Sequence, residues 1–183
     1  EIRNALMNRR IDVDTKLSIF STYIVGLMKK KQELNRVDSL FAEMLEQYPQ
    51  EEPVHRLFGM YLSSRKDFSR AEEQYAIAAD LAPTNPENWL QLIGLYLYQE
   101  KYAEVIRVGK RAIQYVPDQK DIYMYVAVAS AQTKSYDEAL SMLETGLNYV
   151  EENDAGTKSF FYGQMGDVYH SAGDREKSYE MYE

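Results

Sequence analysis

The sequence predicts an all-α fold built from antiparallel helix hairpins that repeat along the chain. Prolines recur at a spacing of 34 residues, at Pro49, Pro83 and Pro117. Between these prolines, apolar residues recur in steps of three and four, which is the spacing of amphipathic helices rather than of strands. Short polar segments separate the predicted helices, and connections this short place neighbouring helices antiparallel.

The period divides the chain into repeats, whose residues are numbered here from position 1 to position 34. Residues 1–17 are expected to be the end of an upstream helical element, because Ile2, Leu6 and Met7 have helical spacing. Asp14 is the predicted N-cap of the helix that follows. The array then covers 18–183, as 18–51, 52–85, 86–119, 120–153 and a partial repeat at 159–183.

Each repeat is identified by the residues at positions 7, 20 and 32. The first four repeats hold Ile24, Val37 and Pro49, then Phe58, Ala71 and Pro83, then Leu92, Val105 and Pro117, then Val126, Ala139 and Glu151. In the second repeat the helices are predicted over 54–64 and 68–81. The partial repeat follows a five-residue insertion, and the acidic segment 151–156 is expected to be a loop. Proline at position 32 ends the second helix of a repeat, since proline lacks the backbone N–H that a helix needs.

These residues resemble the tetratricopeptide repeat (TPR), whose pattern is Trp-x2-Leu-Gly-x2-Tyr, then Ala-x3-Phe, then Pro. The second repeat carries Phe58-Gly59-x2-Leu62, then Ala71-x3-Tyr75-x2-Ala78, then Pro83. The third carries Trp89-x2-Leu92-x3-Tyr96, then Ala112 and Pro117. Departures from the pattern are Gly109 in place of an aromatic residue, Ile93 in place of glycine, and Glu151 in place of proline. The resemblance implies a right-handed solenoid whose first helices line a groove.

Composition excludes several classes of function. Twenty-nine Asp and Glu against 21 Lys and Arg leave a net charge of −8, which opposes binding to nucleic-acid phosphates. There are no cysteines, and His55 and His170 are the only histidines. His55 falls on a packing position, whereas Asp167 and His170 share a helix face but have no third metal ligand. We therefore predict no catalytic, metal-binding or cofactor-binding residues, and no apolar run reaches the length of a transmembrane helix.

The candidate binding residues lie on the side of each first helix that faces away from its hairpin partner. At about 100° per residue, these are positions 2, 5, 9, 12 and 13. The candidates are Lys29, Arg56, Met60, Leu90, Leu97, Tyr98, Met124, Val128, Gln132, Asp167 and His170. Leu90, Leu97, Met124 and Val128 are the expected apolar anchors, unless stacked first helices bury them against each other. Lys29 and Arg56 are expected to contact any acidic flank of a ligand.

The sequence thus predicts a non-catalytic scaffold that binds a protein or peptide, as an extended segment or a helix laid in the groove. Self-association through the apolar patch is one alternative. Binding of RNA, as in a related 35-residue helical repeat, is another, although the spacing of 34 and the acidic balance oppose it. We interpret the chain as a fragment of a larger protein, because it begins at Glu1 and stops inside an amphipathic pattern. The sequence does not determine the cellular compartment, which is cytoplasmic or, if the protein is exported, periplasmic.

Overall fold

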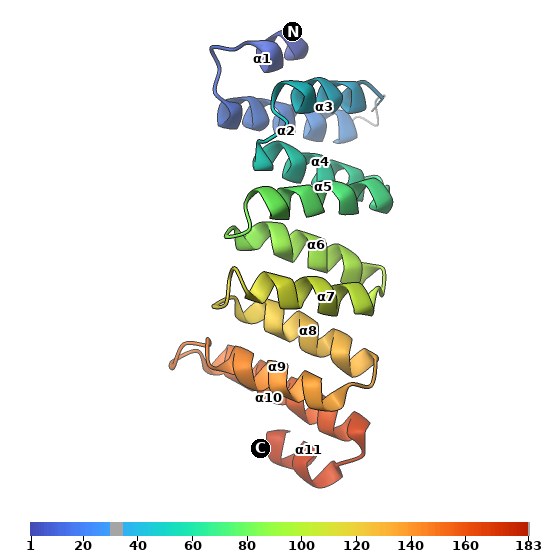
Figure 1. Cartoon of the computed structure of the whole chain (residues 1–183), viewed down its shortest axis with the longest axis vertical. Coiled ribbons are helices and arrows are strands. Elements are labelled where there is room, and N and C mark those ends of the chain that lie inside the picture. Colours follow the sequence, from blue (N-terminus) through green and yellow to red (C-terminus); the bar gives the residue numbers. More distant parts are fainter. Residues whose placement is uncertain (30–34, 183) are drawn as a thin grey trace. The chain divides into compact units, whose positions relative to one another are not determined.

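A computed structural model describes residues 1–29 and 35–182, and over this range every regular element is a helix (Figure 1). The predicted all-α class of antiparallel helix hairpins is confirmed. The helices are α1 (Ile2–Met7), α2 (Val13–Lys29), α3 (Asn35–Gln47), α4 (Glu52–Ser64), α5 (Phe68–Leu81), α6 (Pro86–Tyr98), α7 (Tyr102–Ile113), α8 (Lys120–Gln132), α9 (Tyr136–Leu147), α10 (Ala155–Ala172) and α11 (Arg175–Tyr182).

The chain forms two compact units, Glu1–Ala82 and Pro83–Glu183. Unit 1 contains α1 to α5, and unit 2 contains α6 to α11. In the repeats, α2, α4, α6, α8 and α10 are the first helices, and α3, α5, α7, α9 and α11 are the second helices. The predicted helix 68–81 coincides with α5, and the predicted helix 54–64 starts two residues earlier, at Glu52.

The turns inside the last four hairpins share one geometry. Position 15 has a positive φ in four repeats, at Lys66 (62°), Glu100 (56°), Lys134 (62°) and Gly173 (89°). The residue after it donates its N–H to a carbonyl five residues earlier, as from Asp67 to Leu62 (3.0 Å) and from Asp174 to Tyr169 (2.9 Å). This bond closes a Schellman motif, which satisfies the last carbonyls of the first helix and turns the chain back.

The connection between repeats is fastened by the side chain at position 4. Trp89 Nε1 donates to the Pro83 carbonyl at 2.7 Å, and the Tyr123 hydroxyl donates to the Pro117 carbonyl at 2.8 Å. His55 Nε2 lies 3.1 Å from the Pro49 carbonyl, and its other ring nitrogen lies 2.9 Å from Gln74 Oε1. In three repeats, therefore, a different side chain at position 4 contacts the equivalent carbonyl, that of the proline at position 32 of the preceding repeat. His55 is buried and is a packing residue, as predicted.

Aromatic rings form the core of unit 1. The Phe41 ring on α3 lies 4.6 Å from Phe20 on α2 and 4.4 Å from Phe58 on α4, measured between ring centroids. These distances are typical of favourable aromatic pairs. The α4–α5 hairpin closes over Gly59, where an added Cβ would lie 2.7 Å from the Tyr75 ring. A small residue at position 8 therefore lets the two helices approach closely.

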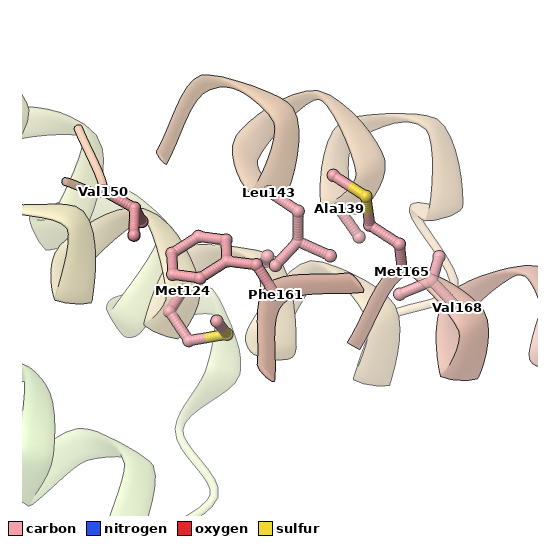
Figure 2. Close-up of a cluster of buried hydrophobic side chains, with 8 residues drawn as sticks. Met124, Ala139, Leu143, Val150, Phe161, Met165 and Val168 are labelled. Carbon is pink, nitrogen blue, oxygen red and sulfur yellow. The ribbon is translucent and has the colours of Figure 1, made fainter. Parts of the chain in front are cut away.

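The core of unit 2 includes a cluster that joins α8, α9 and α10 (Figure 2). Its buried members are Met124, Ala127, Ala139, Leu143, Val150, Phe161, Met165 and Val168. The departure at Gly109 has a packing reason, since an added Cβ would lie 2.3 Å from Val126 Cγ2. Val126, from the next repeat, thus fills the space where the first, second and last repeats carry the aromatic rings of Phe41, Tyr75 and Tyr182.

Two helix starts differ from the sequence expectation. Helix α2 begins at Val13, and its cap is Asp12 rather than Asp14, because the Thr15 N–H donates to Asp12 Oδ1 at 2.8 Å. The Thr15 N–H and hydroxyl also lower the pKa of Asp12. Helix α10 begins at Ala155, so the predicted loop 151–156 is shorter than expected. There Asp154 accepts the Thr157 N–H at 3.0 Å and caps the helix.

Candidate functional site

A cleft of about 170 Å³ lies in unit 2 between the first helices α8 and α10. It brings together three predicted residues, Val128, Gln132 and Asp167. Its complete lining is Ala127, Val128, Ala131, Gln132, Leu143, Gln164, Asp167, Val168 and Ser171. The floor is apolar and the rim carries two amides, a hydroxyl and a carboxylate. Amide groups both donate and accept hydrogen bonds, which suits them to contact a peptide backbone.

The carboxylate of this cleft is held from the second helix of the same hairpin. The Tyr182 hydroxyl on α11 donates to Asp167 Oδ1 at 2.6 Å, and Gln164 Nε2 donates to Oδ2 at 3.4 Å. Donation to Asp167 raises the pKa of Tyr182, because the bond favours the protonated hydroxyl. Asp167 is itself exposed at the cleft. The cleft therefore presents an oriented carboxylate whose hydrogen-bond donors are neutral groups.

Unit 1 has a cleft in the corresponding place, between the first helices α2 and α4. Its volume is about 220 Å³, and it includes the predicted residues Arg56 and Met60. Its complete lining is Leu17, Ser18, Ser21, Pro53, Arg56, Leu57 and Met60. Arg56 Nε forms a salt bridge with Glu52 Oε1 at 2.9 Å, and Met60 is 46% exposed. This cleft thus combines an apolar wall with a guanidinium.

The remaining predicted residues lie outside these two clefts. Leu90 and Leu97 on α6 are half-buried, and Tyr98 is 69% exposed. His170 is exposed near the end of α10. The side chain of Lys29 lies outside the described residues.

Met124 does not have the predicted exposure. It is 6% exposed and belongs to the cluster with Phe161 and Leu143 (Figure 2). The expectation that Met124 is an accessible anchor is therefore wrong, and the alternative of burial between stacked repeats holds for this residue. The physical reason is that α10 of the following repeat covers the face of α8 on which Met124 lies.

Solved structures share this architecture, whereas no family model and no curated protein sequence matches the chain. The structure of MamA superposes with a TM-score of 0.70 at 15% identity, covering 91% of this chain and 87% of MamA. YrrB, described as a TPR protein with an unusual peptide-binding site, gives 0.67 at 16%, covering 98% and 88%. BtubC from P. vanneervenii gives 0.69 at 18%, covering 98% and 82%.

The chain has the TPR fold. The resemblance noted in the sequence is thereby confirmed at the level of architecture, and the hairpins correspond to TPR-like solenoid repeats. Both clefts lie between the first helices of consecutive repeats, and Leu143 of the second helix α9 also lines the cleft in unit 2.

Three residues on this side of α10 were not among the sequence candidates: Phe160, Gln164 and Ser171. With Asp167 they follow the spacing i, i+4, i+7 and i+11, which places all four on one helix face. Gln164 and Ser171 line the cleft, and Phe160 is 58% exposed on the same face. Phe160 and Ser171 fall at positions 2 and 13 of the partial repeat, which are among the positions expected to face away from the hairpin partner, whereas Gln164 falls outside them.

The described residues were also compared with the patterns of metal sites and of membrane-spanning helices. Within residues 1–29 and 35–182, no three His, Cys, Asp or Glu side chains are grouped as metal ligands would be. Over the same range, none of the helices has the length and apolar character needed to cross a membrane.

Proposed function

We propose that this chain is a non-catalytic scaffold that binds a peptide segment or a helix of a partner protein along the open side of its first helices. The observation that carries the proposal is the α8–α10 cleft, where predicted residues from two repeats, Val128, Gln132 and Asp167, surround one cavity. Its lining combines apolar contact with amide groups. YrrB, which shares the fold, is described as having a peptide-binding site.

Rigidity supports the same function. Schellman turns end both α8 and α10, and the Tyr123 hydroxyl bonds the start of α8 to the Pro117 carbonyl, which favours a preformed cleft. A preformed site loses little conformational entropy on binding. An extended segment can therefore bind through a small number of side-chain contacts.

The test uses a phage-displayed pool of random peptides about 12 residues long as the probe for the full chain. We expect selected peptides to bind with micromolar Kd. Val128→Gln, which removes apolar surface from the cleft, should weaken them at least about tenfold, or about 1.4 kcal/mol. Glu144→Gln is the control, because Glu144 is exposed on α9 and outside the cleft. Failure to select any peptide, or equal binding by both variants, would contradict the proposal.

Self-association is a second candidate, favoured by exposed aromatic rings in the last repeat. Phe160 is 58% exposed, Tyr162 is 42% exposed and Tyr179 is 71% exposed. Exposed apolar groups in one region often mark an interface. Light scattering over a hundredfold range of protein concentration tests this function, and a constant monomer mass would exclude it.

A further inference from the structure

The first helices of unit 2 carry few cationic side chains on the side that faces away from the hairpins. Helix α6, with the sequence PENWLQLIGLYLY, contains no lysine or arginine. Helices α8 and α10 contribute Lys120 and Lys158 near their N-terminal ends. Lys158 donates to the Glu152 carbonyl at 2.9 Å, and Lys120 helps to lower the pKa of Asp154 after the larger effect of Thr157. Both lysines thus interact with the connection before α10.

Several other cations of unit 2 lie on second helices and interact with neighbours there. Arg107 contacts Glu104 at 2.6 Å, Lys110 pairs with Glu138, and the Arg111 guanidinium lies 5.3 Å from the Trp89 ring. Asp167, in contrast, receives its hydrogen bonds from Tyr182 and Gln164. Its negative charge therefore remains at the cleft, where a ligand can neutralise it.

The size of the cleft limits what enters it. A volume of about 170 Å³ is well below the roughly 300–1,000 Å³ of pockets that enclose a whole small molecule. The cleft therefore accommodates one side chain of a longer segment. Its apolar floor suits an aliphatic chain, whereas its rim ends in a carboxylate.

We propose that the α8–α10 cleft selects a lysine or arginine side chain of a bound peptide, a specificity that rests on the function proposed above. The aliphatic stem packs on Val128 and Val168, and the cationic head pairs with Asp167. Long basic side chains combine these two properties, because their methylene stems bury readily while the charge stays at the surface. Phe160 lies two helical turns from Asp167 on the same face, so its exposed ring offers a contact for a neighbouring side chain of the peptide rather than for the cation itself.

Tyr182 is a positioning residue in this arrangement. Its hydroxyl occupies Asp167 Oδ1, which restricts rotation of the carboxylate before a ligand binds. Its ring also packs over Gly166, where an added Cβ would approach it to 2.7 Å. Tyr182→Phe keeps the ring but removes the hydrogen bond. This variant should therefore reduce the preference for basic side chains less than Asp167→Asn does.

The experiment presents the full chain with a positional-scanning peptide library, about nine residues long, whose ends are acetylated and amidated so that terminal charges are removed. The pools fix Lys, Arg, Gln or Glu at each position in turn. We expect Lys and Arg pools to bind at least about tenfold more tightly than Gln pools at one position, and Glu pools to bind most weakly. Because the ion pair lies at the surface, the preference should shrink between about 50 mM and about 500 mM salt.

Three variants test whether the preference for Lys and Arg over Gln arises in the α8–α10 cleft. Asp167→Asn should abolish it, Tyr182→Phe should reduce it about two- to fivefold, and Glu144→Gln should leave it unchanged. Tight binding without a basic preference, or a preference that survives both Asp167→Asn and high salt, would overturn this inference and leave the scaffold function standing. Failure of every pool to bind would overturn both. A dimer seen by light scattering and lost in Asp167→Asn would identify a second copy as the occupant and overturn the assignment to a partner peptide.

Discussion

The clefts of the two units have the same place in the fold but opposite chemistry. In unit 1, Arg56 contributes a guanidinium to the space between α2 and α4. In unit 2, Asp167 contributes a carboxylate to the space between α8 and α10. The repeat architecture therefore determines where a cleft forms. The side chains at positions that the TPR pattern does not fix, here Arg56 and Asp167, determine the charge of the cleft.

The residues at position 5 of the second and fourth repeats also differ between the units. Arg56 occupies this position in the second repeat and remains half-exposed beside a cleft. Met124 occupies it in the fourth repeat and is buried among side chains of α9 and α10. One repeat position can therefore line an accessible cleft in one unit and belong to the core in the other.

The largest expected effect separates these two residues. Met124→Ala should lower the free energy of unfolding by about 2–5 kcal/mol, because it opens a cavity inside the cluster of Figure 2. Arg56→Ala should change it by less than about 0.5 kcal/mol, since the side chain is partly exposed. Urea denaturation followed by circular dichroism measures both values. Equal losses in the two variants would show that position 5 has the same role in both units.

The second-largest difference in stability should come from the glycines at which the two helices of a hairpin meet. Gly59→Ala in unit 1 forces a Cβ against the Tyr75 ring, which is only 2% exposed and has little room to move. We expect a loss of about 1–3 kcal/mol from overpacking. Gly166→Ala in unit 2 meets the Tyr182 ring, which is 55% exposed and can swing outward. Its loss should stay below about 1 kcal/mol, and thermal melts of the two variants compare them directly.

Alkaline pH should destabilise unit 2 through Tyr123, the tyrosine at position 4. Burial, followed by hydrogen bonding to Tyr149, raises the pKa of Tyr123 to about 12, compared with 10.0 for an unperturbed tyrosine. A raised pKa in the folded state stabilises fully below the unfolded value, and this stability is lost as the pH rises towards the folded value. The stability of unit 2 should therefore fall between about pH 10 and about pH 12.

The matching control for this prediction is Tyr123→Phe. It should lower stability at neutral pH, because the Pro117 carbonyl loses its donor, but it should show a smaller fall above pH 10 than the unmodified chain. Unit 1 holds His55 at position 4, but burial raises the pKa of Tyr61 on α4, so the comparison that isolates Tyr123 is the one with Tyr123→Phe. Urea titrations across this range test the difference. If the free energy of unfolding fell equally with pH in the unmodified chain and in Tyr123→Phe, Tyr123 would contribute nothing to the loss of stability above pH 10.

The smallest expected effect is shared by the two units. Added Cβ atoms at Gly26 on α2 and Gly94 on α6 would meet nothing within 4 Å. Gly26→Ala and Gly94→Ala should therefore each stabilise by about 0.4–1 kcal/mol, because alanine lowers the entropy of the unfolded chain. A loss of stability in either variant, measured by differential scanning calorimetry, would mean that its helix face is covered in solution.

The sequence by itself determined the period of 34, the division into helix pairs and the side of each first helix that faces away from its partner. Such features are local, since they depend on spacing along one helix or between neighbouring helices. For that reason the helix predicted over 68–81 agrees with α5, and Val128, Gln132 and Asp167 belong to one cleft.

The packing of neighbouring helices determines which of those side chains a following repeat covers. Met124 and Val128 share a face of α8, yet Met124 is buried by α10 whereas Val128 lines a cleft. The bond from Tyr182 to Asp167 likewise joins residues on two helices. Burial depends on how closely the next helix packs, and that distance is set by the side chains of both helices together, which no pattern along a single helix contains.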